Sequence, residues 1–172
     1  MWRLVSAFID IALHRRGPEH IPASQFLLNL VFVVYMLVGY AAISIGGPAM
    51  PAAIAVFVID SLVYLLYVWA ILVFLKQPGR FRQTATALLG ADVFFNVIGI
   101  PLFVWNRMTA SAELDPTLPT LLILGLLIWS IDVAGYVISR ALQRPYIVGV
   151  LVVILYVMTS MSIRESFNPV SP

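Results

Sequence analysis

The chain has 172 residues, of which 62% are hydrophobic and 10% are charged, whereas soluble domains are about half apolar and a quarter charged. This composition excludes a soluble globular protein and predicts an integral membrane protein, while a net charge of +2 leaves no basic stripe for a nucleic-acid partner. With no cysteine and two histidines, the chain cannot build disulfides, thiolate nucleophiles or Cys/His zinc clusters, and we expect no metal and no cofactor.

An amphipathic helix is predicted at the N-terminus. Its polar face carries Arg3, Ser6, Asp10 and His14 at helical spacing. Its other face carries Leu4, Val5, Phe8, Ile11 and Ala12. This pattern is typical of a helix that lies in the membrane interface. Because the apolar part is short, contains Asp10 and has no small-residue cleavage site, a signal peptide is disfavoured.

Five apolar segments follow, each predicted to be a transmembrane helix. They span about residues 26–46, 52–75, 84–105, 120–139 and 145–163. Pro101 inside the third segment predicts a kink, because proline removes one backbone hydrogen bond. The predicted fold is therefore an all-α integral membrane protein in three parts. Residues 1–24 form the cytoplasmic amphipathic helix and linker, 25–164 the five-helix transmembrane domain, and 165–172 a short non-cytoplasmic tail.

The distribution of positive charge predicts the orientation. With the N-terminus in the cytoplasm, eight of the ten Lys and Arg residues lie on the cytoplasmic side, and only Arg107 and Arg164 lie outside. Such a bias is typical of polytopic membrane proteins and indicates a C-terminus on the far side. Six of the inner arginines are expected to contact anionic lipid headgroups, which makes membrane lipids a predicted partner. They are Arg15, Arg16, Arg80, Arg82, Arg140 and Arg144.

Three aspartates fall within the predicted spans, and each has a hydrogen-bonding residue four positions later on the same helical face. The pairs are Asp60 with Tyr64, Asp92 with Asn96, and Asp132 with Tyr136. A carboxylate at the bilayer centre costs at least about 2.5 kcal/mol, so each should face the bundle interior or a water-filled cleft. Two interpretations stay open: polar pairs that hold helices in register, or a site for a proton or cation.

Depth along the helices suggests that two of these aspartates meet. Asp92 and Asp132 lie roughly 12 Å and 11 Å from the cytoplasmic ends of their spans, given the rise of 1.5 Å per residue. We therefore expect them to face each other, where they could share a proton or bind an arginine. Arg82, Arg140 and Arg144 are placed at helix ends from which their long side chains could reach inward.

Enzymatic activity is not expected from these residues. A serine nucleophile would need a histidine base, but both histidines lie together at His14 and His20. A membrane aspartyl protease would pair two aspartates at one depth, as Asp92 and Asp132 could. The run Gly90-Ala91-Asp92, however, lacks the Gly-x-Gly-Asp motif that such proteases carry.

The span layout over residues 26–163, together with the Asp-Val-Ala-Gly-Tyr stretch at 132–136, resembles the Yip family of small membrane proteins, including its bacterial members. The chain departs from the family in lacking an Asp-Leu-Tyr-Gly-Pro run and in having only about 25 residues before the first span. The run at 15–24 also resembles the opening of small proteobacterial inner-membrane proteins. The Yip resemblance implies a non-catalytic role in organising membrane or recruiting partners. The second resemblance implies no activity, but together with the charge distribution it predicts a bacterial inner membrane and a periplasmic C-terminus.

Two functions remain open at this point. The favoured one is a non-enzymatic scaffold, subunit or membrane-organising factor that meets lipid, a protein partner or a second copy of itself. The alternative is a small oligomeric ion-coupled transporter that uses Asp60, Asp92 and Asp132 as protonation sites. Replacing the three aspartates by asparagine distinguishes the two functions. A scaffold should still assemble, whereas a transporter should lose its proton-dependent transport.

The charge distribution generates a prediction for topology. A reporter that is active only outside the cytoplasm should be active when fused after Pro172 and silent when placed at Gly79. Activity at Gly79 with silence at Pro172 would contradict the five-span arrangement with a cytoplasmic N-terminus.

Overall fold

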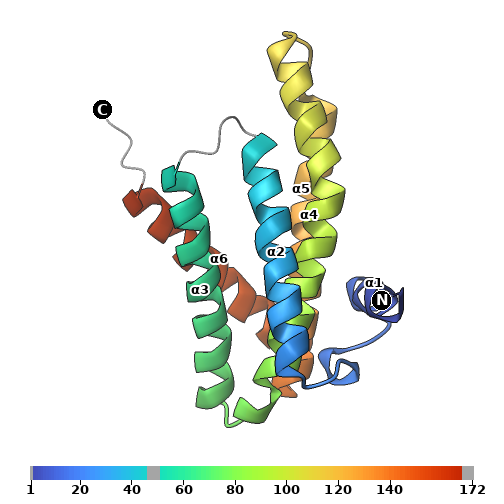
Figure 1. The fold of residues 1–172 in the computed structure, drawn as a ribbon, viewed down its shortest axis with the longest axis vertical. Helices are drawn as coiled ribbons and strands as arrows, with labels where there is room; N and C mark the ends of the chain where they lie inside the picture. The colour runs from blue at the N-terminus through green and yellow to red at the C-terminus, as the bar shows by residue number, and fades with distance from the viewer. Residues whose placement is uncertain (1, 46–50, 168–172) are drawn as a thin grey trace.

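The computed structural model describes residues 2–45 and 51–167, and over these residues the chain is helical with no strand (Figure 1). The long elements are α1 (Trp2–Ala12), α2 (Gln25–Ile45), α3 (Pro51–Phe74), α4 (Phe81–Ser111), α5 (Thr117–Leu142) and α6 (Tyr146–Phe167). Two short 3₁₀ turns, η1 (Pro18–His20) and η2 (Pro78–Arg80), precede α2 and α4. The all-α fold predicted from the composition and the apolar segments is therefore confirmed.

Among the described residues, four helices are long and apolar enough to cross a membrane: Gln25–Ile45, Ala53–Phe74, the stretch Pro78–Ser111 and Thr117–Leu142. The described apolar part of α6, Tyr146–Ser162, is shorter, so a fifth crossing stays a prediction. Helix α6 continues to Phe167, past the predicted end of the fifth span at residue 163. The rest of the predicted tail, like the predicted end of the first span at Gly46, lies outside the described residues.

Helix α4 is longer than predicted at both ends. It begins at Phe81, directly after η2, and continues through Pro101 to Ser111. No glycine or proline interrupts residues 102–115, so the helix ends only near Glu113, whose φ of 55° is left-handed. The extra turns carry α4 beyond the end of the predicted span at Trp105.

The paired helices α4 and α5 form the centre of the bundle, with α2 packed along α4 and α6 packed against α5 (Figure 1). Leu89 of α4 and Val133 and Val137 of α5 are completely buried. The α5–α6 contact is especially close, because a Cβ added to Gly149 would lie 2.0 Å from the carbonyl oxygen of Gly135. Glycines at this crossing let the two backbones approach more closely than larger residues would.

Helix α1 lies across the α4–α5 pair and is viewed end-on in Figure 1. The Phe8 ring packs on Gly90, where an added Cβ would lie 2.2 Å from the ring. Trp129 Nε1 donates a hydrogen bond of 3.1 Å to the Ala12 carbonyl oxygen, and Ile11 and Ala12 are buried. Part of the apolar face predicted for lipid thus contacts protein. The location of α1 in the membrane interface stays a prediction.

The linker after α1 is held to the bundle by polar contacts. Arg140 forms an ion pair with Glu19, and Gln83 Nε2 donates to the Ile21 carbonyl oxygen at 2.9 Å. Burial opposes ionisation of Glu19, but hydrogen bonds from its own backbone N–H and from Arg140 outweigh it and hold its pKa below the usual value. Glu19 therefore stays ionised and paired near neutral pH.

Three of the arginines predicted to contact lipid headgroups have protein partners. Arg16 forms a 3.2 Å ion pair with Asp10, and Arg140 pairs with Glu19. Arg80 Nη1 lies 3.2 Å from the carbonyl oxygen of Arg140 and 3.4 Å from that of Ala141, at the C-terminal end of α5. These contacts leave headgroup binding by the six arginines a prediction.

The Phe8–Gly90 contact generates a test of α1 docking. Gly90→Leu should displace the Phe8 ring, at a cost of about 1–3 kcal/mol typical of overpacking, and detach α1 from α4. Amide hydrogen exchange of residues 2–12 should then become faster. Gly125→Leu is the matched control, because an added Cβ at Gly125 meets nothing within 4 Å. Unchanged exchange in Gly90→Leu would show that α1 does not depend on this contact.

Candidate functional site

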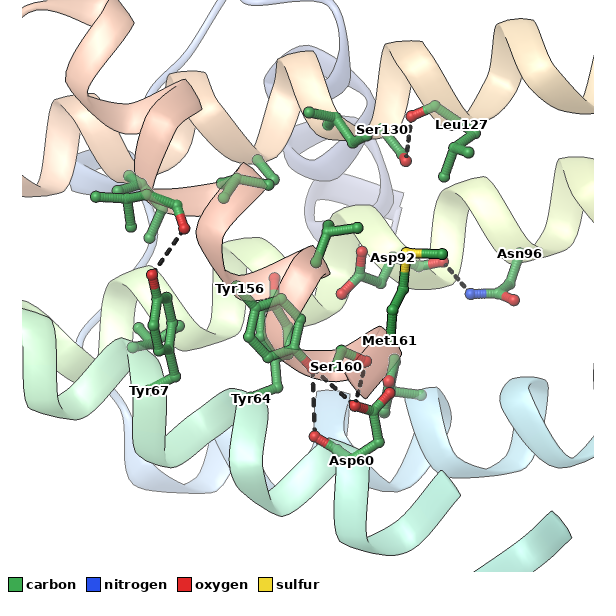
Figure 2. A pocket seen from close by; sticks show the side chains of 18 residues that line it. Asp60, Tyr64, Tyr67, Asp92, Asn96, Leu127, Ser130, Tyr156, Ser160 and Met161 are labelled. Carbon is green, nitrogen blue, oxygen red and sulfur yellow. Dashed lines mark hydrogen bonds between the residues drawn. The ribbon is translucent and has the colours of Figure 1, made fainter. Parts of the chain in front are cut away.

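A cavity of about 570 Å³ lies between the long helices, and all five of them contribute to its wall (Figure 2). This volume falls within the range of about 300–1,000 Å³ that is typical of small-molecule sites. Its polar lining comprises Tyr35 of α2, Asp60, Tyr64 and Tyr67 of α3, Asp92 and Asn96 of α4, Ser130 of α5, and Tyr156 and Ser160 of α6. Polar side chains from five apolar helices thus converge on one space.

Four of the six polar residues singled out in the sequence line this cavity: Asp60, Tyr64, Asp92 and Asn96. Their spacing of four residues places both members of each pair on the same face, as expected. The members of the α4 pair do not bond through the carboxylate, however. Asn96 Nδ2 donates instead to the backbone carbonyl oxygen of Asp92, at 2.8 Å.

Asp60 is buried and has protein partners on α6. Its Oδ1 accepts a hydrogen bond of 2.6 Å from Ser160 Oγ and one of 3.2 Å from the Tyr156 hydroxyl. Figure 2 shows both donors turned toward this carboxylate. Asp60 therefore joins α3 to α6, which matches the interpretation of an intramembrane aspartate as a contact between helices.

Asp92 is in a different situation. Within the described part of the chain, no side chain donates a hydrogen bond to its carboxylate or forms an ion pair with it. In Figure 2 the carboxylate points into the cavity. An ionised carboxylate without a partner is costly inside a membrane bundle. The Asp92 side chain is therefore either protonated, and so neutral, or ionised and paired with a cation that enters the cavity.

Asp132 does not line the cavity, and the predicted facing of Asp92 and Asp132 does not hold. The Asp132 carboxylate accepts a hydrogen bond from the Tyr146 hydroxyl, and its Oδ2 lies 3.4 Å from the buried Nε2 of His14. Tyr136 accompanies it, with its ring edge-on to the His14 ring at a centroid distance of 4.5 Å. This pair therefore faces the end of α1 and the start of α6.

The predicted arginine partners of the aspartates also differ from those observed. Arg140 pairs with Glu19, and in the described ranges no arginine forms an ion pair with Asp92 or Asp132. Equal depth in the membrane does not by itself bring Asp92 and Asp132 together. The faces that helices turn toward each other also depend on how each helix is rotated about its own axis.

The contribution of α6 to the cavity was not predicted from the sequence. Tyr156 and Ser160 were not singled out, although they are four residues apart like the three pairs that were. Tyr67 was missed as well, and its hydroxyl donates a 2.7 Å hydrogen bond to the Val152 carbonyl oxygen of α6. A search for all polar pairs at this spacing would have found the α6 pair. The Tyr67 contact has no such local signal.

Tyrosine rings form one wall of the cavity. The Tyr64 and Tyr156 ring centroids are 4.8 Å apart, and those of Tyr67 and Tyr156 are 5.4 Å apart. Across the described residues, no group of three or more His, Cys, Asp or Glu side chains is placed to hold a metal ion. Chemically, the site offers one carboxylate without a protein partner, an aromatic wall and an apolar remainder.

The Asp60 contacts generate a test of its role in stability. Asp60→Ala should lower the thermal unfolding midpoint in detergent, because unsatisfied Tyr156 and Ser160 hydroxyls cost about 1–3 kcal/mol. Asp60→Asn keeps an acceptor oxygen and should lower the midpoint less. Ser130→Ala is the control, since the Ser130 hydroxyl donates only within its own helix, to the Leu127 carbonyl oxygen. Wild-type midpoints for both Asp60 variants would exclude this role.

Comparisons of the chain with protein-family models, with curated proteins and with solved structures found no match. The resemblance to the Yip family therefore stays a prediction that depends on the span layout and on residues 132–136.

Proposed function

We propose that this protein is a small membrane carrier that binds a positively charged solute in the cavity, with the Asp92 carboxylate as the counter-charge. One observation carries the proposal: this carboxylate lines a cavity within the bundle and has no protein partner among the described residues. This is the transporter alternative raised by the sequence, with the binding role now assigned to Asp92 alone.

The contrast between two aspartates in one cavity supports this assignment. A residue that only joins helices is expected to have its partner inside the bundle, as Asp60 has in Ser160 and Tyr156. Asp92 has no such partner among the described residues, so a role in joining helices does not account for a carboxylate at this position. The scaffold function favoured by the sequence therefore accounts for Asp60 and not for Asp92.

The depth of the cavity also suits a carrier. Asp92 is eleven residues after the start of α4, or about 16 Å along the helix, and Asp60 is nine residues after the start of α3, or about 13 Å. The hydrocarbon core of a bilayer is about 30 Å thick, so both residues fall well inside it. Carriers commonly bind their solutes near this level, between helices that can shift relative to one another.

Other features of the proposal come from the sequence alone. The cytoplasmic N-terminus, the periplasmic C-terminus, the bacterial inner membrane and a homo-oligomeric assembly stay predictions. An oligomer would supply the surrounding protein that a five-helix chain cannot supply by itself.

Charge movement in proteoliposomes tests the proposal. The protein is reconstituted on a supported membrane and exposed to rapid steps of acid pH, sodium, potassium and choline while transient currents are recorded. At least one of these cations should give a current, and Asp92→Asn should reduce it at least about tenfold, as expected when a buried counter-charge is lost.

Asp132→Asn is the matched control. Asp132 is also an aspartate within a long apolar helix, but its side chain does not line the cavity. This variant should keep the wild-type current. The absence of a current with all four cations, or an undiminished current in Asp92→Asn, would overturn the proposed function.

A further inference from the structure

We infer that the cavity takes a methylated ammonium ion, an organic cation held by Asp92 and by the tyrosine rings of α3 and α6. The inference rests on the proposed function and names its substrate class. It follows from what the cavity offers a ligand: its size, the Asp92 carboxylate, its aromatic wall and the apolar side chains of the remaining lining.

The donor set disfavours an inorganic cation. Metal ions in proteins take several oxygen or nitrogen ligands arranged around one point. The described residues contain no group of three or more His, Cys, Asp or Glu side chains that could hold a metal ion, and Asp60 Oδ1 already accepts hydrogen bonds from Ser160 and Tyr156. A proton would need no cavity at all, whereas this one measures about 570 Å³. Such a volume suits an organic molecule.

The tyrosine wall suits the charged end of such a molecule. Tyr67 and Tyr156 both line the cavity. The Tyr67 hydroxyl donates to the Val152 carbonyl oxygen, and the Tyr156 hydroxyl lies within hydrogen-bonding distance of Asp60. Tyr64 packs against Tyr156 and lines the cavity with Asp92 (Figure 2). Aromatic rings attract ammonium groups within about 6 Å of the ring centre, and aromatic cages are a recurrent site for quaternary ammonium.

The rest of the lining favours a methylated ammonium over a primary amine. An –NH₃⁺ group needs acceptors for three donors. Apolar side chains line much of the remaining wall, including Val68, Ile131 and Ala134. Methyl groups on the nitrogen would pack against such a wall without leaving unsatisfied donors.

Equilibrium binding to the purified protein in detergent tests the inference, with radiolabelled choline as the probe. Choline should bind and should be displaced by tetramethylammonium. Sodium, potassium and the uncharged carbon analogue of choline should not displace it at matched concentrations. Failure of choline to bind, or equal displacement by the uncharged analogue, would overturn the inference.

Two variants of Tyr64 distinguish the contribution of its aromatic ring from that of its hydroxyl. Tyr64→Phe keeps the aromatic face and should retain choline affinity, whereas Tyr64→Leu should weaken it roughly 2- to 30-fold, the range expected for one cation–π contact. Both should elute as monodisperse protein. Wild-type affinity in a folded Tyr64→Leu variant would exclude the aromatic contribution and overturn the inference as stated.

The binding and current measurements together separate the two proposals. An Asp92-dependent current from acid, sodium or potassium without choline binding would leave the carrier function standing and overturn the ammonium inference. Asp92-dependent choline binding without any current would uphold the ligand class and overturn transport. Neither binding nor current would overturn both.

Discussion

An ionisable side chain within an apolar helix bundle must find a partner, because the hydrocarbon around it offers none. The three aspartates of the predicted spans satisfy this constraint in different ways. Asp60 meets hydroxyls of α6, and Asp132 meets His14 and Tyr146. Asp92 instead faces a cavity. The carboxylates of Asp60 and Asp132 thus contact other elements of the protein, whereas the carboxylate of Asp92 lines the cavity.

The contacts of Asp132 make the N-terminal segment part of the fold. His14 follows α1 directly, and its contact with Asp132 lies close to the Trp129 hydrogen bond to Ala12. Together with the Phe8 ring on Gly90, these contacts join α1 to both central helices. A segment whose sequence is typical of a membrane-surface helix is therefore attached to the bundle by aromatic packing and by polar contacts.

Packing in the bundle is uneven, and this unevenness creates the cavity. On one side, Gly135 and Gly149 let α5 and α6 approach until their backbones are in contact. On the other side, the α3 residues opposite α6 are large, and polar contacts such as Asp60 to Ser160 hold the two helices together. Helices α5 and α6 approach closely at their glycines, while tyrosines lie between α3 and α6. The cavity is lined by residues of all five long helices.

The sequence by itself determined the all-α fold, the approximate helix bounds and which polar residues share a helical face. These properties depend on local composition and on the 3.6-residue period, which any single helix displays. Asp60 and Tyr64 accordingly share one face of α3, and Asp92 and Asn96 share one face of α4, as their spacing requires. Only the tertiary structure decided that Asp60 bonds to Tyr156 and Ser160 of α6, that Asp92 has no bonded partner among the described side chains, and that Asp132 lies against His14. Depth follows from the rise per residue, but the rotation of each helix depends on its packing against every neighbour at once, and no local pattern contains that information.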